Sequence, residues 1–428
     1  FNLIRSKEPG SLESVFYDLS SSTFSGSRCI LSKWGHCKEG FKTHVVLALV
    51  VDKNGYPFYW EVLAGNTADT TTILGLVEKL SKRFKITNST LVFDRGMVSD
   101  ENLRLLEGED IKYISALDRN QVESVSGFNF SSLSDLKLKE KEGSLLRYHN
   151  FTRFNGSTYF KEIRQEGKRR YILCFNPQLF KDQQDARLKS IEDFKEFVRL
   201  QNQELRQAVK SRNLTTTKKR FDKEKKRRKL NHIVEITLNE IHIMRRDSKG
   251  VPQRVRTYQA QVTIDEQELR SQGQIDGFWM LVTNHIEKEK ALFEISSEDI
   301  ITPYQDKHII EAAFRDIKSF VEIAPIHVWT DEHVKAHYTI CVLAYLINRT
   351  ITRRLHENPG KQTADVITHE TLYEAVDDCK VDEILVKNIG LKFCSITELN
   401  HIQKELLIRV GIDSLIANPG GEELVLLM

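Results

Sequence analysis

Four polar residues suited to phosphate or metal chemistry lie along one edge of a predicted helix, residues 302–320. They are Tyr304, Lys307, Glu311 and Lys318. Each residue turns an α-helix by about 100°, so the four side chains fall within a sector of roughly 60°. Apolar residues fill the neighbouring stripe, which places one carboxylate among cations beside a buried face. The plainer interpretation is a salt-bridged edge of a surface helix, since most exposed charges have no special role.

Three residues mark the start of this helix. Thr302 can cap it, Pro303 suits the first helical position, and Gln305 stands three residues after Thr302, as in a capping box. The sequence therefore predicts one continuous helix over residues 302–320.

Two aspartates belong to predicted core strands. Asp18 lies within one strand, and Asp94 ends another. An unpaired carboxylate in a buried strand is costly, so each of them needs a partner. Structural partners are at hand: Asp94 could cap the turn that follows it, and Asp18 could bond the serine-rich loop after its strand.

The functional interpretation is that Asp18, Asp94 and Glu311 meet and bind divalent metal. Ligand sets made only of oxygen suit Mg²⁺, or Mn²⁺ in its place, rather than zinc. Two such ions about 4 Å apart activate an attacking oxygen and stabilise a leaving oxygen during phosphodiester cleavage. Asp18, from a central strand, is the expected bridging ligand.

The other residues of the helix row fit the same chemistry. Lys307 and Lys318 are expected to hold the phosphates beside the scissile bond, which lowers the negative field that the nucleophile must cross. Tyr304 is expected to bond a phosphate or to stack on a sugar or base. Asp69 and Asp276 are interpreted as a helix cap and a turn residue, and the scattered histidines as structural.

Composition sets broader limits. A chain of 428 residues suggests about two or three domains. Hydrophobic residues make up 40% and charged residues 29%, as in folded soluble proteins. No apolar stretch is long enough to cross a bilayer, and no secretory signal is present. The 6 cysteines form no CxxC pair, which favours free thiols in a reducing cytoplasm over zinc or disulfides.

The order of apolar runs predicts a mixed α/β sheet flanked by helices. Three strands come first, at residues 14–20, 43–52 and 57–63, and Asn54-Gly55 is a hairpin signal between the last two. A helix, a strand ending in Asp94, a second helix and a further strand complete a first part of the core, residues 1–117.

The pattern changes after this point. Residues 118–275 are predicted to be an inserted, mostly β domain that carries a long charged helical segment. The core resumes over residues 276–358, and residues 359–428 form a C-terminal region with dimerisation as its candidate role. Within these blocks, strands are predicted at 144–150, 157–163, 169–175, 233–244, 256–264 and 278–282, and helices at 181–229, 286–295 and 331–355.

A basic run stands in the charged helical segment. Residues 218–229 hold nine basic residues and two acids. Lys225, Lys226, Arg227 and Arg228 are candidate contacts to a nucleic-acid backbone, which would make binding depend strongly on salt. The alternative is a solvated helix face.

With these residues in place, the chain resembles the DDE transposases of prokaryotic insertion sequences, in the group with a β-rich insertion before the catalytic Glu. That group carries the signature Tyr-x2-Arg-x3-Glu-x6-Lys. Tyr304, Lys307, Glu311 and Lys318 match every spacing, with Lys307 in place of Arg, which keeps the charge and loses the bidentate fork. The segments YDLSSSTF, GNTAD, FDRGM and DGFWMLVTN also resemble recurrent segments of the group, in the same order.

The resemblance implies an RNase H-like core, dependence on Mg²⁺, and cut-and-paste movement of a DNA element. It also implies a DNA-recognition region before Phe1, and a chain that does not begin with Met suggests that such a piece is missing.

The expected function is therefore DNA transposition. Water at a two-metal site would cut the element end, and the freed 3′ hydroxyl would attack target DNA by transesterification. The expected partners are the terminal inverted repeats, target DNA and a second copy of the chain, as a homodimer on DNA. The expected location is the cytoplasm of a prokaryote, at the nucleoid. Two alternatives are a nuclease of the same fold that never joins strands, and a non-catalytic DNA-binding relic.

Overall fold

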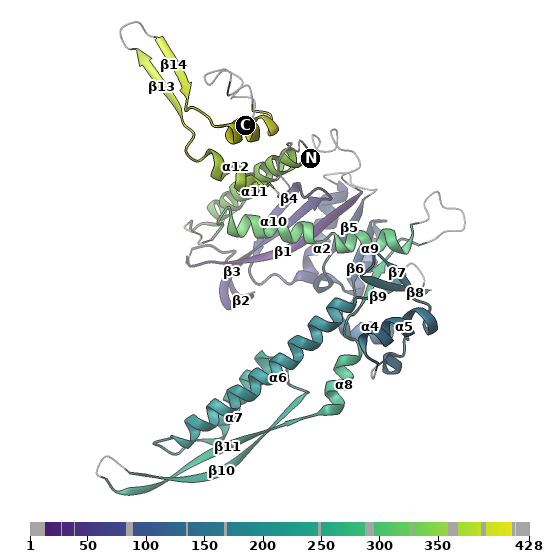
Figure 1. Cartoon of the computed structure of the whole chain (residues 1–428), viewed down its shortest axis with the longest axis vertical. Coiled ribbons are helices and arrows are strands. Elements are labelled where there is room, and N and C mark those ends of the chain that lie inside the picture. The colour runs from purple at the N-terminus through teal and green to yellow at the C-terminus, as the bar shows by residue number, and fades with distance from the viewer. Residues whose placement is uncertain are drawn as a thin grey trace. The chain divides into compact units, whose positions relative to one another are not determined.

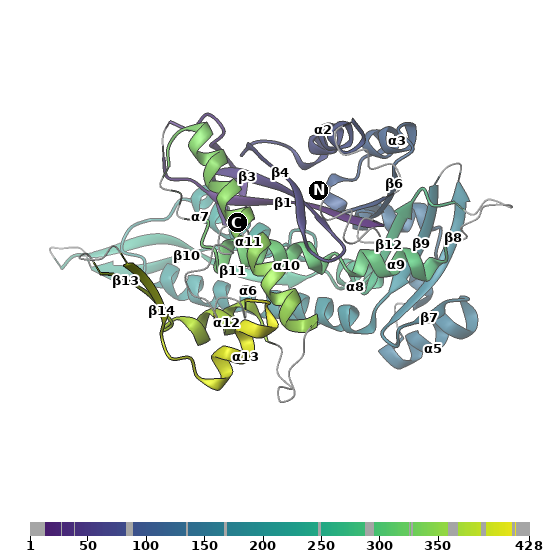
Figure 2. The same cartoon turned by 90° about the horizontal axis from the view of Figure 1, so that it is seen from above.

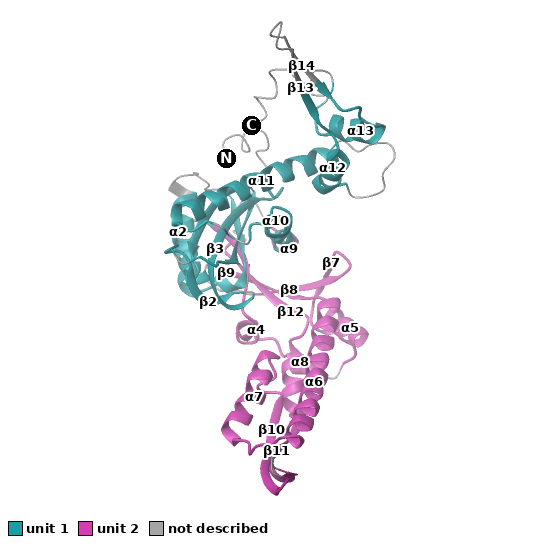
Figure 3. Ribbon diagram, turned by 90° about the vertical axis from the view of Figure 1, so that its left-hand side faces the viewer, with its two compact units in different colours: residues 1–111, 303–428 teal, residues 112–302 magenta. Residues whose placement is uncertain are grey.

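The computed structural model describes residues 13–26, 28–37, 39–82, 89–133, 136–166, 169–246, 250–286, 295–324, 326, 328–357, 367–386, 391–412 and 416. The chain divides into two compact units (Figure 3). Unit 1 consists of Phe1–Ile111 and Pro303–Met428, and unit 2 of Lys112–Thr302. Unit 2 is thus inserted in sequence between the two parts of unit 1. The domain limits predicted after residues 117, 275 and 358 stay a prediction.

Both units are mixed α/β, with strands flanked by helices, as predicted (Figure 1). The strands of unit 1 are β1 (Ser14–Thr23), β2 (Lys33–Cys37), β3 (Gly40–Asp52), β4 (Pro57–Ala64) and β5 (Thr90–Phe93). β1 runs antiparallel to β3 and parallel to β5, and β3 also pairs antiparallel with β2 and β4. The predicted strands are confirmed. β2 was not predicted, because its five residues, KWGHC, include a glycine and no run of apolar residues.

The hairpin between β3 and β4 forms where the sequence predicts it. β3 is buried along most of its length because its run of valines, leucines and alanine packs on both faces. At its end, Asp52 Oδ1 accepts hydrogen bonds from the backbone N–H of Asn54 (2.9 Å) and of Tyr56 (2.8 Å). Gly55 has a φ of 81°, a conformation that glycine adopts without strain.

Helices cover both sides of these strands. α2 (Asp69–Lys82) and α3 (Asp100–Gly108) lie on the side opposite α10 (His308–Ser319), as Figure 2 shows. α11 (Asp331–Glu357) packs on β4 and on α10, and its Tyr345 hydroxyl donates to the carbonyl of Gly55 over 2.8 Å. This bond ties α11 to the β3–β4 hairpin.

The C-terminal part of unit 1 has a small core of its own. It contains α12 (His369–Val376), β13 (Val381–Val386), β14 (Leu391–Ile396) and α13 (His401–Arg409). Its buried residues are Leu355, Leu372, Leu399, Leu406, Leu407 and Val410.

The helix predicted over residues 302–320 is two helices, so this prediction is wrong. α9 (Ser297–Gln305) ends just before α10 begins, and Pro303 lies inside α9 rather than at a helix start. Proline cannot donate to the carbonyl four residues earlier and crowds it, so a helix is weak around it. The helix is interrupted by a turn at Asp306 and Lys307, and α10 begins at His308 with Lys307 as its N-cap, whose backbone stays in the right-handed helical region. The helix predicted over residues 286–295 falls largely on residues outside those described.

Unit 2 has an antiparallel sheet in the order β6-β12-β9-β8-β7. These strands are β6 (Lys112–Ala116), β7 (Thr152–Phe154), β8 (Thr158–Glu166), β9 (Arg169–Phe175) and β12 (Phe278–Thr283). α4 (Arg119–Ser126) and α5 (Leu138–Tyr148) also belong to this unit. The strand predicted at 144–150 is wrong, because those residues mostly form the end of α5, which buries Leu145 at helical spacing from Lys141.

The rest of unit 2 is a two-stranded ribbon packed against two helices (Figures 1 and 3). The elements are α6 (Pro177–Arg206), α7 (Leu214–Arg227), β10 (Val234–Arg246), β11 (Pro252–Ile264) and α8 (Glu266–Gln274). Their core includes Phe194, Phe221 and Val234. α6 and α7 confirm the long charged helical segment. Among the described residues of 118–275, however, helices cover more of the chain than strands, so "mostly β" was a wrong description of this block.

Asp276 is the centre of a buried ion-pair cluster in unit 2. It lies in a turn, as predicted, but its side chain is 0% exposed. Arg187 donates to Asp276 through Nη1 and Nη2, each at 2.6 Å, and Arg119 Nη2 donates to it at 2.8 Å. Two guanidinium groups therefore share one carboxylate that water does not reach.

Lys141 is a second buried charge in unit 2. Its side chain is 1% exposed, and its ammonium lies 4.3 Å from the ring centre of Phe180. Burial lowers the pKa of Lys141 to about 8, although the charge of Asp276 opposes this shift. The poorly solvated ammonium of Lys141 therefore destabilises the folded state of unit 2.

Replacing Lys141 by Met is expected to raise the free energy of unfolding at pH 7 by roughly 2 kcal/mol, because the buried charge is gone and the chain length is kept. Below pH 8 both folded and unfolded wild-type chains hold the proton, so this difference is constant. Between about pH 8 and the unfolded pKa of about 10.4, only the unfolded chain holds it, and wild-type stability rises with pH. Urea unfolding of both proteins from pH 7 to 10 should show that the difference in free energy of unfolding between variant and wild type becomes smaller as the pH rises. A difference that grows with pH would contradict the lowered pKa of Lys141.

No described helix has both the length and the apolar composition that crossing a bilayer requires. Cys29, Cys37, Cys174, Cys341 and Cys379 are free thiols, which confirms the expectation for these five.

Candidate functional site

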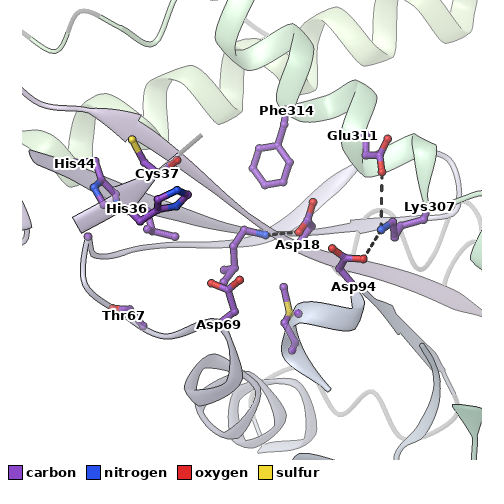
Figure 4. A pocket seen from close by; sticks show the side chains of 16 residues that line it. Asp18, His36, Cys37, His44, Thr67, Asp69, Asp94, Lys307, Glu311 and Phe314 are labelled. Atoms are coloured by element: carbon purple, nitrogen blue, oxygen red, sulfur yellow. Dashed lines mark hydrogen bonds and ion pairs between the residues drawn. The ribbon is translucent and has the colours of Figure 1, made fainter. Parts of the chain in front are cut away.

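A cavity of about 610 Å³ in unit 1 brings together the three acids that the sequence singles out (Figure 4). Asp18 comes from β1, Asp94 follows β5, and Glu311 lies in the first turn of α10. Lys307 lines the same cavity. Residues from both sequence segments of unit 1 therefore meet at one place.

Asp18 stands on an interior strand. β1 lies between β3 and β5, and Asp18 pairs with Leu49 in the β1–β3 register. The side chain is half-buried, and its Oδ1 accepts from the backbone N–H of Leu19 over 2.8 Å. Because Val15, Phe16 and Tyr17 just before it are buried, β1 holds this carboxylate on a rigid support.

Asp94 and Glu311 are joined through Lys307. Lys307 Nζ lies 2.8 Å from Asp94 Oδ1 and 3.9 Å from Glu311 Oε1. Burial raises the pKa of Asp94, but the hydrogen bond and charge of Lys307, helped by Arg95, outweigh it and leave the pKa below its usual value. Asp94 is therefore an ionised carboxylate. Glu311 is 61% exposed, so its pairing with Lys307 is weak.

Lys307 lies between α9 and α10. Lys307 is the N-cap of α10, and its carbonyl accepts from the backbone N–H of Ile310 over 3.1 Å. Its ammonium lies 5.6 Å from the ring centre of Tyr304, which belongs to α9. The predicted polar row is thus split, with Tyr304 on one helix and Glu311 and Lys318 on the next.

Lys318 reaches the strand that carries Asp18. It lies in the last turn of α10, and its Nζ donates to the carbonyl of Ser21 on β1 over 2.7 Å. Ser21 lines the cavity, whereas Lys318 is not among the lining residues. Lys318 therefore ties α10 to β1 beside the three acids.

The basic run lies in unit 2, on and just after α7. Lys226 and Arg227 are exposed, and Lys225 and Arg228 are half-buried. Glu224 accepts from both Arg227 and Arg228, at 2.5 and 2.7 Å. Two of the four predicted DNA contacts in this run, Arg227 and Arg228, are therefore engaged in ion pairs within the protein.

Four further lining residues were not proposed as site residues from the sequence: His36, Cys37, His44 and Asp69. Asp69 begins α2, as a helix-start residue should, and also faces the cavity (Figure 4). Burial raises the pKa of Asp69, and the charge of Asp94 raises it further. Asp69 is the acid of the GNTAD segment, but an acid at the start of a helix is also an ordinary capping residue, so the sequence does not distinguish the two roles.

The histidines are placed by the β2–β3 hairpin. His44 is buried, and its Nδ1 lies 2.9 Å from the carbonyl oxygen of Lys42. The chain after β4 passes so close that a Cβ on Gly65 would lie 2.0 Å from the carbonyl oxygen of His44. Glycine is therefore required at this edge of the cavity.

The donor set of the cavity suits a hard cation, because Asp18, Asp94 and Glu311 offer only carboxylate oxygens. Across the described residues, no three His, Cys, Asp or Glu side chains are gathered closely enough to hold a metal ion. The ammonium of Lys307 lies between two of these acids, bonded to Asp94 and more distant from Glu311 (Figure 4).

Comparisons with known proteins cover Asp94, Lys307 and Glu311, whereas Asp18 lies just before the matched range. The family model described as "Transposase DDE domain" matches residues 20–347. No curated protein matches the chain. Among solved structures, the chain is similar to a piggyBac transposase in a synaptic complex with hairpin DNA, at 9% sequence identity and a TM-score of 0.35. That match covers 84% of this chain and 50% of the other, so the chain spans half the length of that protein; a likeness this weak supports no argument about mechanism.

Proposed function

Because the chain belongs to the family of transposases with a DDE domain, we propose that it cuts DNA at the ends of an insertion sequence and joins them to target DNA. The observation that carries this proposal is that Asp18, Asp94 and Glu311 line one cavity. The subgroup with the Tyr-x2-Arg-x3-Glu-x6-Lys signature is part of the proposal, with Lys307 at its Arg position.

The proposed metal ligands are Asp18, Asp94 and Glu311, and the proposed ions are two Mg²⁺, with Mn²⁺ as a substitute. Divalent ions at such a site supply an activated oxygen nucleophile and offset the charge on the leaving oxygen. Asp18 is held on an interior strand, and Asp94 is kept ionised at neutral pH, so both are ready to bind a cation.

Lys307 has two proposed positions. Without DNA its ammonium pairs with Asp94 and offsets part of the negative charge that Asp94 and Glu311 place on the cavity. When a DNA phosphate enters, the same ammonium can turn to the phosphate and leave the acids to the metal. A flexible lysine side chain suits this exchange better than a bidentate arginine fork.

The proposed reaction has two chemical steps at this one site. Water attacks a phosphorus atom at the element end, breaks its bond to the 3′ oxygen and releases a 3′ hydroxyl. This hydroxyl then attacks a phosphodiester of the target, forming one P–O bond and breaking another, so no outside energy source is needed. Tyr304 and Lys318 are proposed to hold the DNA backbone beside these bonds.

We also propose that unit 1 is the RNase H-like core and unit 2 the insertion. The support is a sheet with an antiparallel β1–β3–β4 hairpin series, β5 parallel to β1, and a final acid on a helix after unit 2. Terminal inverted repeats, target DNA and a second copy of the chain are the proposed partners, in the cytoplasm of a prokaryote.

A strand-transfer assay tests the function. A labelled duplex carrying the element end is incubated with the chain, supercoiled plasmid and Mg²⁺. Label joined covalently to plasmid is the expected result. Cutting without joining would instead indicate a nuclease, and binding without either reaction would indicate a DNA-binding relic.

A further inference from the structure

The β10–β11 ribbon of unit 2 has two halves with different surroundings. In the half next to α8, Val234, Ile236 and Leu238 pack with Ala260 and Val262 into the core beneath α6 and α7. These residues share one face of the ribbon, since the strands pair in continuous register. The opposite face is exposed along this half.

The buried face changes near the middle of the ribbon. Beyond Asn239 the other face of the ribbon, which carries Arg245 and Thr257, packs against α6. Thr257 Oγ1 donates a hydrogen bond to the carbonyl of Leu205 over 3.0 Å. Arg245 Nη2 donates a hydrogen bond to the carbonyl of Arg206 over 2.9 Å. Two-stranded ribbons twist strongly, and the twist exchanges the face that packs. The face that was buried in the first half is therefore turned to solvent in the second.

This outward surface is basic, and we call it the basic ribbon face. Its residues are His242, Met244, Arg246, Arg254 and Arg256. His242 lies opposite Arg256 and Met244 opposite Arg254, so the side chains of each pair are neighbours. All five are exposed. Glu240 is an acid on the same face, and its Oε1 lies 3.5 Å from Nε2 of His242.

The arginines of this face differ from those on the helices. Elsewhere in unit 2, arginines pair with carboxylates, as in Arg199–Glu196, Arg220–Glu204, Arg227–Glu224 and Arg228–Asp193. Within the described part of the chain, no carboxylate pairs with Arg246, Arg254 or Arg256. Three exposed guanidinium groups on one rigid surface are thus available to an anionic partner.

We propose that the basic ribbon face binds double-stranded DNA, with Arg246, Arg254 and Arg256 on backbone phosphates and the ribbon along the major groove. The groove is about 12 Å wide and admits a two-stranded ribbon. The distal half, residues 240–246 with 252–258, is about 23 Å long at roughly 3.3 Å per residue, within one DNA turn of about 34 Å. A row of arginines with no carboxylate partner among the described residues suits the regularly spaced phosphates of DNA better than it suits a small anion.

This inference rests on the proposed function, because it names a surface by which the same protein would hold its DNA. It adds a contact that the sequence did not suggest. The predicted backbone contacts were on the helical segment, where Arg227 and Arg228 are already paired with Glu224. The ribbon arginines are instead dispersed in the sequence, with Arg246 at the end of β10 and Arg254 and Arg256 on either side of Val255 in β11, so they form no long basic run.

The test compares the full chain with a variant carrying Arg246→Ala, Arg254→Ala and Arg256→Ala. Binding of a labelled 30-base-pair duplex is measured by fluorescence anisotropy from about 50 to 200 mM KCl, the range over which phosphate contacts are lost. The variant is expected to bind at least about tenfold more weakly at 100 mM salt. Its slope of log K against log salt should fall by about 2.7, at roughly 0.9 per phosphate contact.

Three controls sharpen this test. Lys181→Ala, Lys189→Ala and Lys195→Ala, combined on α6, remove three exposed cations of the same unit and should leave affinity and slope unchanged. Exchanging the three ribbon arginines for lysine should restore the slope, because the charge is kept. Each single Arg→Gln change should lower the slope by about 0.9. These single variants test the proposal even when the triple variant does not fold.

The outcomes separate the two proposals. A triple variant that binds duplex with wild-type affinity and slope overturns the ribbon proposal and leaves the transposase proposal standing. A wild-type chain that binds no duplex under any of these conditions overturns both.

Discussion

Exchange of Glu311 for Gln is expected to abolish DNA cleavage and joining while the protein stays folded and still binds duplex. The change removes one anionic ligand from the proposed metal site, and metal stabilisation of the transition state is worth several kcal/mol, so the rate should fall on the order of 10³-fold or more. Folding should be nearly unaffected, because Glu311 is 61% exposed and its partner Lys307 lies 3.9 Å away. The assay is cleavage of a labelled element end in Mg²⁺, with thermal unfolding and anisotropy on the same preparation.

Glu332→Gln is the matched control. Glu332 is an exposed glutamate in the first turn of α11, in the same unit and outside the cavity. It should cut and join DNA like wild type. Normal cutting by Glu311→Gln would reject its role as a ligand, and loss of folding would show that the residue is structural.

Exchange of Asp276 for Ala is expected to cost about 3–5 kcal/mol of stability, the range for breaking a buried ion pair. The variant leaves Arg119 and Arg187 close together without the carboxylate that both of them bond. Lys141 would lose a favourable charge as well, since Asp276 raises its pKa. Urea unfolding at pH 7 measures the loss.

Asp185→Ala is the control for this change, because Asp185 is an exposed aspartate on α6 in the same unit. Its removal should alter the free energy of unfolding by less than about 0.5 kcal/mol, as for most surface substitutions. A loss below about 1 kcal/mol for Asp276→Ala would mean that water enters and solvates the two arginines.

The elements built on long apolar runs were predictable from the sequence. β1, β3, β4 and β5 appear where their buried runs stand, and the β3–β4 turn follows from Asn54-Gly55. Strands that are buried on both faces need apolar residues at nearly every position, so a long apolar run in the sequence is enough to locate them. Asp18 and Asp94 were conspicuous for the same reason, as acids where the pattern calls for apolar side chains.

Elements whose pattern fits two structures were not predictable. The capping residues Thr302, Pro303 and Gln305 resemble a helix start, yet they form the last turn of α9. The start of α9 has a local cap of its own, because Ser296 Oγ accepts from the backbone N–H of Asp299 over 3.1 Å and Asp299 Oδ2 accepts from the backbone N–H of Ser296 over 3.3 Å. The sequence therefore offers two similar cap signals, six residues apart, and local pattern does not decide between them.

The cavity was predictable only in part. Asp18, Asp94 and Glu311 were chosen from strand positions and helix spacing, but their meeting depends on how α10 packs across β1 and β3. His36, His44 and Asp69 line the same space and could not be distinguished from structural residues, because each also has an ordinary local environment. The pair of Lys307 with Glu311 has the i,i+4 spacing of any helix, whereas the 2.8 Å contact of Lys307 with Asp94 joins residues far apart in the sequence and is not a local signal.

The division of unit 1 into two sequence segments has a consequence for synthesis. A ribosome makes Asp18 and Asp94 first, then all of unit 2, and only afterwards Glu311. Under the proposed mechanism, a nascent or prematurely released polypeptide has no complete set of ligands. Cutting at this site therefore requires that Glu311 has been translated and that α10 has packed beside the two earlier aspartates.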